Sequence, residues 1–557
     1  MLFTIFQFLL QNCRMNLPFQ TIVSGFPVEV LLSSLVFVLT LVVIQIRGRM
    51  KYQLPPGPKG WPILGIFFDI YDYPAHLAYT EWSKKHGKIF TISVIGRKCV
   101  ILNDAKTIRE AMLNCSPKID DKTDWRYCFI ELLKGLSVMP YSKKWQNTRR
   151  RTAAILKELG MGKSFLEPEI YDETRALVAN LLHHSENGKT NITIKDRIRR
   201  TPINLICSML YNERYDYDDD SLNFILETME YLLTFLRAAS TYDALPNILR
   251  PLMSHTLRDF HAHIKLLNDF LQSKVQYHEE TYKDGVQRDF VDAWIKYRRM
   301  NLKKNQSENV EGVSQEANGT SACTSLSTNE DSCSPVVNVL QDVLFAGAHS
   351  TGYVLNWLIM LLTMHKDIQD KVFNAIAEVL GTDRRPTVAD RSQLPIVEAV
   401  IYETLRISTI VPLVGHACYT DVTLCGYHLP KKTEVTYNNW AVNFDEENFP
   451  NAKSFIPHRW LLPDGTFDRE STNKFFPFGL GKRGCAGETL AKAELFIITT
   501  TLYQSCEFLM PDGDVGSKHM PEIKHIQSFV LEPKPYMVRV KRRSEVNSKN
   551  VEIPSQP

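Results

Sequence analysis

The run Phe478-Gly479-Leu480-Gly481-Lys482-Arg483-Gly484-Cys485-Ala486-Gly487 places four glycines around one cysteine, just before an apolar helical pattern that begins at Glu488. Glycine permits positive φ and lets the backbone approach a flat ligand closely. A cysteine at the start of a helix lies near unpaired N–H groups and the positive end of the helix dipole, which both favour the thiolate. We therefore predict that Cys485 is a metal ligand; a buried structural cysteine in a turn is the alternative.

The spacing within this run is more specific than the cysteine alone. The sequence resembles the cytochrome P450 family, because its haem-binding signature Phe-x-x-Gly-x-Arg-x-Cys-x-Gly is matched by Phe478, Gly481, Arg483, Cys485 and Gly487. The resemblance implies that Cys485 is the proximal thiolate of haem b (iron protoporphyrin IX), a ligand that favours O–O cleavage. It also implies that Arg483 meets a haem propionate and that Phe478 packs beneath the thiolate.

Length, charge and cysteine content narrow the remaining possibilities. The chain has 557 residues, more than one simple core usually holds, so length alone suggests two or more domains. The net charge of +3 gives no sign of nucleic-acid binding. The 11 cysteines contain no Cys-x-x-Cys pair, which indicates reduced thiols on the cytosolic side of a membrane.

The amino-terminal part of the chain predicts a membrane anchor. No charged residue occurs from Val30 to Ile46 and basic residues follow at once, so the positive-inside rule puts the remaining chain in the cytosol. A cleaved signal peptide is the alternative, although the run lacks a small-residue cleavage site. We predict an N-terminal segment 1–27 that starts at Met1 or Met15, a transmembrane anchor 28–46 and a rigid basic, proline-rich hinge 47–62.

Local patterns predict the elements of the body. Residues 301–334 are rich in Ser, Asn, Thr, Glu and Gly and predict a disordered insertion. A helix is then expected from the N-cap Ser334 to about Met364. We also expect a helix at 75–86, strands at 89–94 and 98–102, and a hairpin with its turn at Pro430. By resemblance, residues 63–540 form one domain of the cytochrome P450 fold, mainly α-helical with small β-sheets, followed by a tail 541–557.

The expected long helix contains Ala346-Gly347-Ala348-His349-Ser350-Thr351, which resembles the family's distal-helix motif Ala/Gly-Gly-x-Asp/Glu-Thr-Thr/Ser. The resemblance implies that Ala346 and Gly347 leave room for dioxygen, and that the next polar side chains pass protons to it. Here His349 stands in place of the acid and Ser350 in place of threonine. Histidine can relay protons near neutral pH, and serine keeps a hydroxyl. The alternative is that His349 is only a hydrogen-bonded helix residue, with Ser350 and Thr351 supplying the hydroxyl network.

Further matches complete the predicted site. Trp145 and Arg149 are four residues apart on one helical face and match Trp-x-x-x-Arg, whose side chains meet a haem propionate in the family. His416 matches another propionate position, with a core histidine as the alternative. The last match is the set that locks the core behind the haem in the family: Glu403, Arg406 and Arg459.

Together these matches imply a haem-thiolate monooxygenase of the endoplasmic-reticulum membrane, with its catalytic domain in the cytosol. It would insert one atom of O₂ into a lipophilic small molecule, and we expect steroids or sterols because the motifs resemble the microsomal steroid and xenobiotic branch. Electrons would come from NADPH through NADPH-cytochrome P450 reductase, with cytochrome b5 as a further partner. The departures at residues 349 and 350 keep two alternatives open: an O₂-independent isomerase or dehydratase acting on a peroxide or related lipid, and a haem-binding protein with little turnover.

Overall fold

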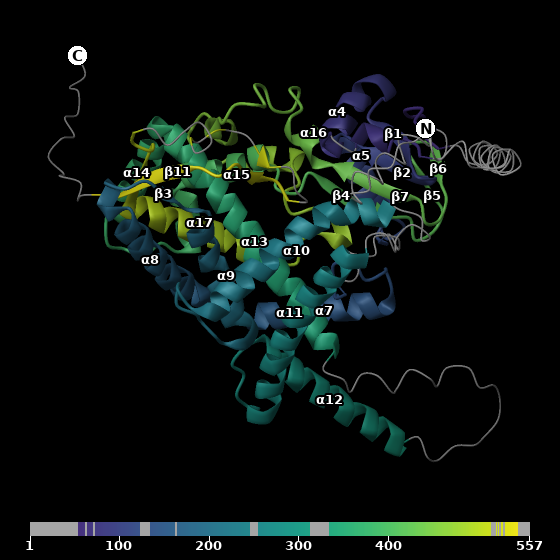
Figure 1. Ribbon diagram of the computed structural model, residues 1–557, viewed down its shortest axis with the longest axis horizontal. Helices are drawn as coiled ribbons and strands as arrows, with labels where there is room; N and C mark the ends of the chain where they lie inside the picture. Colours follow the sequence, from purple (N-terminus) through teal and green to yellow (C-terminus); the bar gives the residue numbers. More distant parts are fainter. Residues whose placement is uncertain are drawn as a thin grey trace, which may run out of the picture.

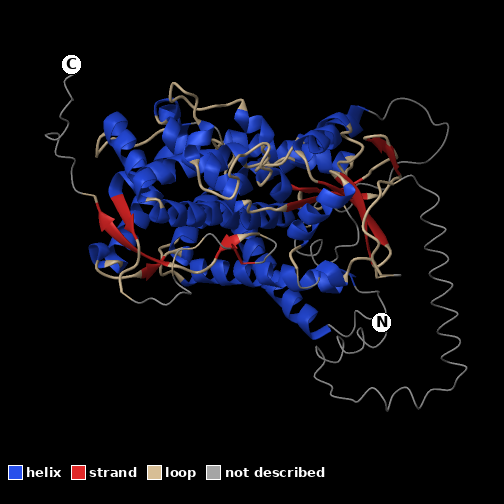
Figure 2. Ribbon diagram, turned by 90° about the horizontal axis from the view of Figure 1, so that it is seen from above, coloured by secondary structure: helices blue, strands red, loops and turns tan. Residues whose placement is uncertain are grey.

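Helices lie in the middle of the molecule and strands gather toward two ends of it (Figure 1, Figure 2). The computed structural model describes residues 54–61, 64–70, 73–122, 134–161, 164–244, 254–311, 334–513, 520, 522, 525–526 and 530–543. The prediction of a mainly α-helical fold with small sheets is confirmed. The helices are α4 (Ala75–His86), α5 (Ala105–Arg109), α7 (Lys143–Glu158), α8 (Glu167–His184), α9 (Lys195–Tyr211), α10 (Asp220–Ala244), α11 (Ser254–Thr281), α12 (Phe290–Glu311), α13 (Ser334–Met364), α14 (Lys366–Leu380), α15 (Pro395–Ser408), α16 (Asn439–Asn443) and α17 (Glu488–Ser505).

The larger sheet joins segments that are far apart in the sequence. Its strand order is β1-β2-β7-β4, in which β2 and β7 are parallel and the other neighbours are antiparallel. A second sheet, β3-β11-β8, lies at the opposite end of the molecule (Figure 1). The strands are β1 (Ile89–Val94), β2 (Arg97–Leu102), β3 (Ile192–Thr193), β4 (Leu413–Ala417), β5 (Val422–Leu424), β6 (Tyr427–Leu429), β7 (Glu434–Asn438), β8 (Cys506–Leu509), β9 (His525–Ile526), β10 (Glu532–Pro533) and β11 (Met537–Arg542).

Helix α13 runs through the centre of the helical part, and most of its residues are buried. It is long and apolar, contains one carboxylate, Asp342, and ends at Met364 as expected. Helix α9 packs closely on it because two glycines of α13 face α9. A Cβ at Gly347 would lie 3.1 Å from a side-chain atom of Ile206, and one at Gly352 would lie 3.1 Å from Arg199. These glycines therefore serve the contact between two helices.

Two expectations about local structure differ from what is observed. Helix α12 continues to Glu311, so the first residues of the expected insertion 301–334 are helical, which their Lys, Gln and Glu content permits. The rest of that insertion up to residue 333 lies outside the described residues. A turn lies at Pro430, where the Thr433 N–H donates to the Pro430 carbonyl over 3.0 Å, but the strands on either side of it, β6 and β7, do not pair, so it is not the turn of a hairpin. The turn between β5 and β6 is at Cys425 and Gly426, both with positive φ, the backbone geometry that a two-residue hairpin turn requires.

The predicted anchor 28–46 and the segment before it lie outside the described residues. Among the helices of the described residues, none is long and apolar enough to cross a membrane. The part of the hinge at 54–61 is non-helical, as expected, and packs on β1: the Thr91 N–H donates to the Pro56 carbonyl (3.4 Å). At the other end, β11 ends at Arg542, two residues inside the expected tail.

Candidate active site

The cysteine loop closes on itself immediately before α17. The N–H of Cys485 donates to the carbonyl of Phe478 over 2.7 Å, and the N–H of Gly484 donates to the carbonyl of Gly481 over 3.1 Å. Gly481 has φ +70°, and a Cβ there would lie 2.5 Å from a main-chain carbonyl oxygen of Met112. This position therefore admits only glycine without a shift of the backbone.

The sulfur of Cys485 is reachable although protein surrounds it. Its side chain is exposed, yet burial raises the pKa of the Cys485 thiol above its ordinary value. The main-chain N–H of Gly487 and the charge of Arg149 lower this pKa, but burial outweighs them. The N–H group at the helix start thus favours the thiolate, as expected, but burial has the larger effect on the pKa in the free protein. Coordination to a metal ion removes the thiol proton outright, so a bound iron would supply the missing stabilisation.

Helix α13 has one open face in an otherwise buried stretch. Ala346 is exposed, whereas Phe345, Ala348 and His349 are buried. Ser350 lies one turn further along the same face, is partly exposed, and donates its hydroxyl to the Ala346 carbonyl over 2.9 Å. Of the two small residues predicted to leave room for dioxygen, Ala346 faces this open side, while Gly347 packs against α9.

His349 points away from the open face. Its Nδ1–H donates to the Phe345 carbonyl over 3.1 Å, and its Nε2 has no partner among the described residues. Burial, and then the charge of Arg199, lower the pKa of His349 to about 3, with Glu230 acting in the opposite direction. The imidazole is therefore neutral at physiological pH, and it belongs to the contact of α13 with α9, near the ion pair of Arg199 with Glu230 of α10 (2.8 Å).

Thr351 connects α13 to the helix that follows the cysteine. Its hydroxyl donates to the Glu494 carboxyl over 3.0 Å, and both side chains are buried. Burial raises the pKa of Glu494 to about 7. Glu494 lies six residues after the first residue of α17, about 9 Å along the helix. This hydrogen bond therefore connects α13 to the first half of α17, the helix that follows Cys485. Glu494 was not among the residues predicted from the sequence, although a carboxylate directly before an apolar run was a usable signal.

Two of the predicted cationic residues meet beside the cysteine loop. Arg149 donates to the Gly484 carbonyl over 2.5 Å. The Arg483 guanidinium lies 3.9 Å above the Trp145 ring and donates to three main-chain carbonyls, of Asp120 (2.8 Å), Leu136 (3.2 Å) and Met139 (2.7 Å). Trp145 itself donates its indole N–H to the Leu136 carbonyl over 3.1 Å. The structure thus brings Trp145, Arg149 and Arg483 together, with main-chain oxygens as the acceptors.

His416 is fully enclosed, and its Nδ1 has no partner among the described residues. Burial lowers the pKa of His416 well below its ordinary value, and the charges of Lys122 and Arg483 lower it further. The unpartnered His416 nitrogen and the positive charges of Lys122 and Arg483 together are suited to binding an anionic group. A guanidinium also carries more N–H groups than the three bonds of Arg483 use. A reachable sulfur with these donors beside it fits haem, which needs an axial ligand and partners for two carboxylates.

The predicted set behind the site forms one buried network. Glu403 accepts from Arg406 at 2.9 and 2.7 Å and from Arg459 Nε at 3.1 Å. It also accepts the Trp460 indole N–H at 2.9 Å. Glu403 and Arg406 are fully buried, so this carboxylate ties α15 to the segment around residue 459. The network stabilises the fold and includes no residue of the open face of α13.

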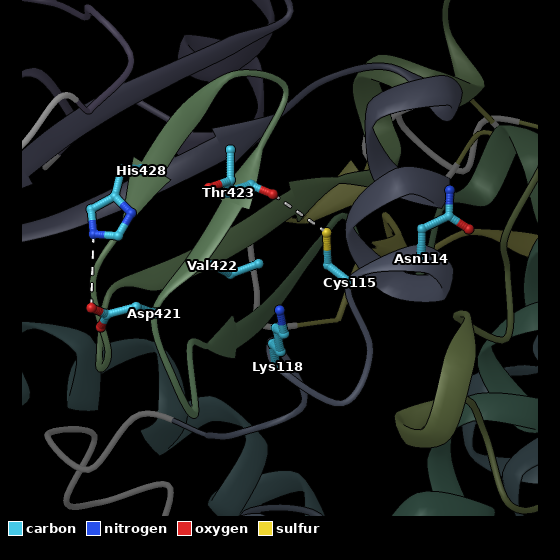
Figure 3. A pocket seen from close by; sticks show the side chains of 7 residues that line it. All are labelled: Asn114, Cys115, Lys118, Asp421, Val422, Thr423 and His428. Carbon is cyan, nitrogen blue, oxygen red and sulfur yellow. Dashed lines mark hydrogen bonds and ion pairs between the residues drawn. The ribbon is translucent and has the colours of Figure 1, made fainter.

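A separate surface pocket of about 260 Å³ lies beside the β5–β6 hairpin (Figure 3). Its Cys115 thiol contacts the Thr423 carbonyl at 3.8 Å, and His428 lies 3.8 Å from Asp421. Burial raises the pKa of the Cys115 thiol, with Glu110 acting in the same direction, so this thiol is a poor nucleophile. None of the predicted site residues lines the pocket, whose walls are Asn114, Cys115, Lys118, Asp421, Val422, Thr423 and His428.

Comparison with known proteins agrees with this geometry. The family model of cytochrome P450 matches residues 55–540. The chain is 30% identical to cytochrome P450 1A1 of Canis lupus familiaris, with 87% of this chain and 91% of that protein aligned. It is also 30% identical to cytochrome P450 2J2 of Homo sapiens, with 88% and 92% aligned. The chain therefore belongs to the cytochrome P450 family and is a monooxygenase that uses haem, with NADPH as its indirect source of electrons.

Proposed function

We propose that this monooxygenase is anchored in the endoplasmic-reticulum membrane by residues 28–46 and oxidises an apolar small molecule of the steroid or sterol class. Its electron donor would be NADPH-cytochrome P450 reductase, with cytochrome b5 as a further donor. The charge-free run and the basic residues after it support the anchor and a cytosolic catalytic domain. The observation that carries the proposal is the exposed residue Cys485 next to Gly484, whose carbonyl accepts from Arg149.

In this proposal the sulfur of Cys485 would hold the haem iron. Trp145, Arg149, Arg483 and His416 would hold its carboxylates, as the hydrogen bonds of the arginines and the unpartnered His416 nitrogen support. Gly481 and Gly487 keep the loop close to a flat ligand. Bound haem supplies the activation of dioxygen, and the protein supplies binding, orientation and charge.

The hydroxyl of Ser350 is proposed to hold a proton at Oγ on the open face of α13. It is partly exposed one turn from Ala346, which supports this role. Thr351 is proposed to hold its proton toward Glu494, whose pKa of about 7 lets that carboxyl change protonation near neutral pH. We propose that His349 contributes packing and a fixed neutral ring, because burial and the charge of Arg199 lower the pKa of His349 to about 3, although its bond to the Phe345 carbonyl acts in the opposite direction.

An apolar substrate is supported by the segment that runs from the end of α15 into β4. Ile410, Leu413 and Val414 are partly exposed, and each packs against a different apolar cluster of the protein. The Ile410 carbonyl also accepts from the Leu531 N–H over 2.9 Å, which fixes this segment. Aliphatic side chains that remain partly exposed between rigid elements are suited to a hydrophobic ligand.

The first test is the reduced, CO-bound absorption spectrum of the purified protein. We expect Cys485→Ala to lose the thiolate-type band and Cys115→Ala, which changes a cysteine outside the site, to keep it. An unchanged spectrum of Cys485→Ala would refute the ligand assignment. Binding spectra with steroids and fatty acids would then test the substrate class, and incorporation of ¹⁸O from ¹⁸O₂ would test the reaction. Turnover of a hydroperoxide without NADPH would instead support the isomerase alternative.

A further inference from the structure

Asp342 attaches an external segment of the chain to the central helix. It is buried on α13, four residues before Ala346, and therefore lies on the same side of the helix as the open face. Its carboxylate accepts the N–H of Ser137 over 2.7 Å and the N–H of Gly135 over 3.3 Å. Both donors belong to residues 134–139, which we call the bridging segment and which precedes α7.

The bridging segment fits Asp342 closely. A Cβ at Gly135 would lie 2.6 Å from the Asn338 carbonyl oxygen and 2.9 Å from the Asp342 carboxyl carbon. Only glycine therefore lets the segment approach α13 this far. The segment lies directly against the helix, and the carboxylate occupies the position where the segment's N–H groups converge.

The carbonyls of the same segment bond to the cysteine loop. Leu136 accepts from Arg483 Nη1 at 3.2 Å and from the Trp145 indole N–H at 3.1 Å, and Met139 accepts from Arg483 Nη2 at 2.7 Å. N–H groups of residues 134–139 thus donate to Asp342 on α13, and carbonyls of the same residues accept from Arg483. A short chain of hydrogen bonds connects the helix with the open face to the loop that carries Cys485.

The ionised carboxylate of Asp342 is stabilised by the N–H groups of this segment. Among the described residues it has no ion-pair partner. Burial raises the pKa of Asp342 to about 6, and the main-chain N–H groups of residues 135–137 act in the opposite direction. If the segment moved away, a carboxylate would be left buried without donors, which is unfavourable. The segment is therefore held in one position by the group that it covers.

We propose that Asp342 is a positioning residue for the haem site: it fixes residues 134–139, whose carbonyls in turn fix the Arg483 guanidinium. This proposal rests on the proposed binding of haem at Cys485. Arg483 can hold an anionic group only if its remaining N–H groups keep one orientation, and main-chain carbonyls on a fixed segment provide that constraint. Without Asp342 the guanidinium would keep its charge, its bond to the Asp120 carbonyl and its stacking on Trp145. It would lose the two fixed carbonyls, of Leu136 and Met139, that hold its terminal nitrogens in one orientation.

The test is the rate at which the purified holoprotein loses haem to an excess of apomyoglobin, measured well below the unfolding temperature. We expect Asp342→Ala to raise this rate about tenfold or more, and Asp342→Asn, which keeps one acceptor oxygen, to raise it less. Asn356→Ala is the matched control, because Asn356 is buried on the same helix and accepts from Tyr536, far from the segment. An unchanged rate in Asp342→Ala, or an equal increase in Asn356→Ala, would overturn the proposal.

A double-mutant cycle separates positioning from a general loss of stability. Arg483→Lys keeps the charge and loses the planar fork that contacts Leu136 and Met139. If Asp342 acts through Arg483, the Asp342→Ala change will raise haem loss much less in the Arg483→Lys background. Fully additive effects would refute this route, and Asp342→Asn replaces Asp342→Ala in the cycle if the alanine variant yields no holoprotein. Failure of the proposed haem site itself would be recognised separately, because wild type would then lack the thiolate-type CO band.

Discussion

Replacing Glu403 with alanine is expected to remove a large part of the protein's stability. Glu403 is fully buried at the centre of a network, where it accepts from the guanidinium of Arg406 at 2.7 and 2.9 Å. It also accepts from Arg459 Nε at 3.1 Å, from the Trp460 indole N–H at 2.9 Å and from the Ile456 N–H at 2.9 Å. One carboxylate therefore satisfies donors from four other residues.

The size of the effect follows from what the alanine variant leaves behind. Removing one partner of a buried ion pair destabilises a protein by about 3–5 kcal/mol, because the other charge remains buried. Each buried donor left without an acceptor adds about 1–3 kcal/mol when counted alone. In the alanine variant Arg406 still donates to the carbonyls of Asn443 and Ala452, both at 2.7 Å, and these two acceptors partly compensate its buried charge. We therefore expect a loss of about 4 kcal/mol, against a total stability of about 5–15 kcal/mol for a typical domain.

The assay is urea unfolding of the holoprotein, followed by haem absorbance and by tryptophan fluorescence. Glu81→Ala is the control, since Glu81 pairs with Lys84 at 2.8 Å on the surface, and we expect it to change stability by less than about 0.5 kcal/mol. Glu403→Gln, which keeps one acceptor, should fall between the two. A loss below about 1 kcal/mol in Glu403→Ala would contradict the assignment of the network as a structural lock.

Three further changes test other parts of the structure by the same unfolding assay. Gly481→Ala should destabilise the protein by about 1–3 kcal/mol more than Gly465→Ala, because both have positive φ but only Gly481 faces a carbonyl at 2.5 Å. Burial raises the pKa of Glu494 from 4.5 to about 7, so the stability of the wild type falls as pH rises through this range. Relative to the wild type, Glu494→Gln should therefore be more stable by up to about 3 kcal/mol at pH 8 and should differ little at pH 4. Burial opposes a charged His278, but the bond of His278 to Asp289 (2.6 Å) outweighs it and raises the pKa of His278. The charged pair therefore stabilises the fold at pH values below the ordinary histidine pKa, and this stabilisation is lost as pH rises through the raised pKa. His278→Gln should therefore flatten the stability profile above about pH 6, and an identical profile would contradict the raised pKa.

Much of the architecture could be predicted because its signals are local. The helix at 75–86, the strand at 89–94 and the end of the long helix at Met364 were readable from periodicity and capping residues. Three members of the buried network, Glu403, Arg406 and Arg459, were also predicted, although only by resemblance to a family; its donors Ile456 and Trp460 were not. In each of these cases the deciding residues lie within one element or one short motif.

The missed features depend on residues that are distant in the sequence. Asp342 bonds to residues 205 and 207 positions earlier, and Thr351 bonds to Glu494, 143 positions later. No periodicity connects such pairs, and each polar residue by itself reads as an irregularity in an apolar helix. Gly347 shows the same limit, because a glycine that admits a ligand and a glycine that admits a neighbouring helix look alike in sequence.

The division of α13 into two faces bears on the departure at residue 349. Adjacent residues of a helix point in directions about 100° apart, so residues 349 and 350 face different surroundings. The structure has His349 on the side of α9 with a pKa of about 3, and Ser350 on the open face with Ala346. The change from acid to histidine therefore alters a buried contact between helices, while the open face keeps a hydroxyl. In the function proposed above the open face is the reacting side, and it retains its alcohol, so the loss of the acid is a weak argument against dioxygen chemistry in this protein.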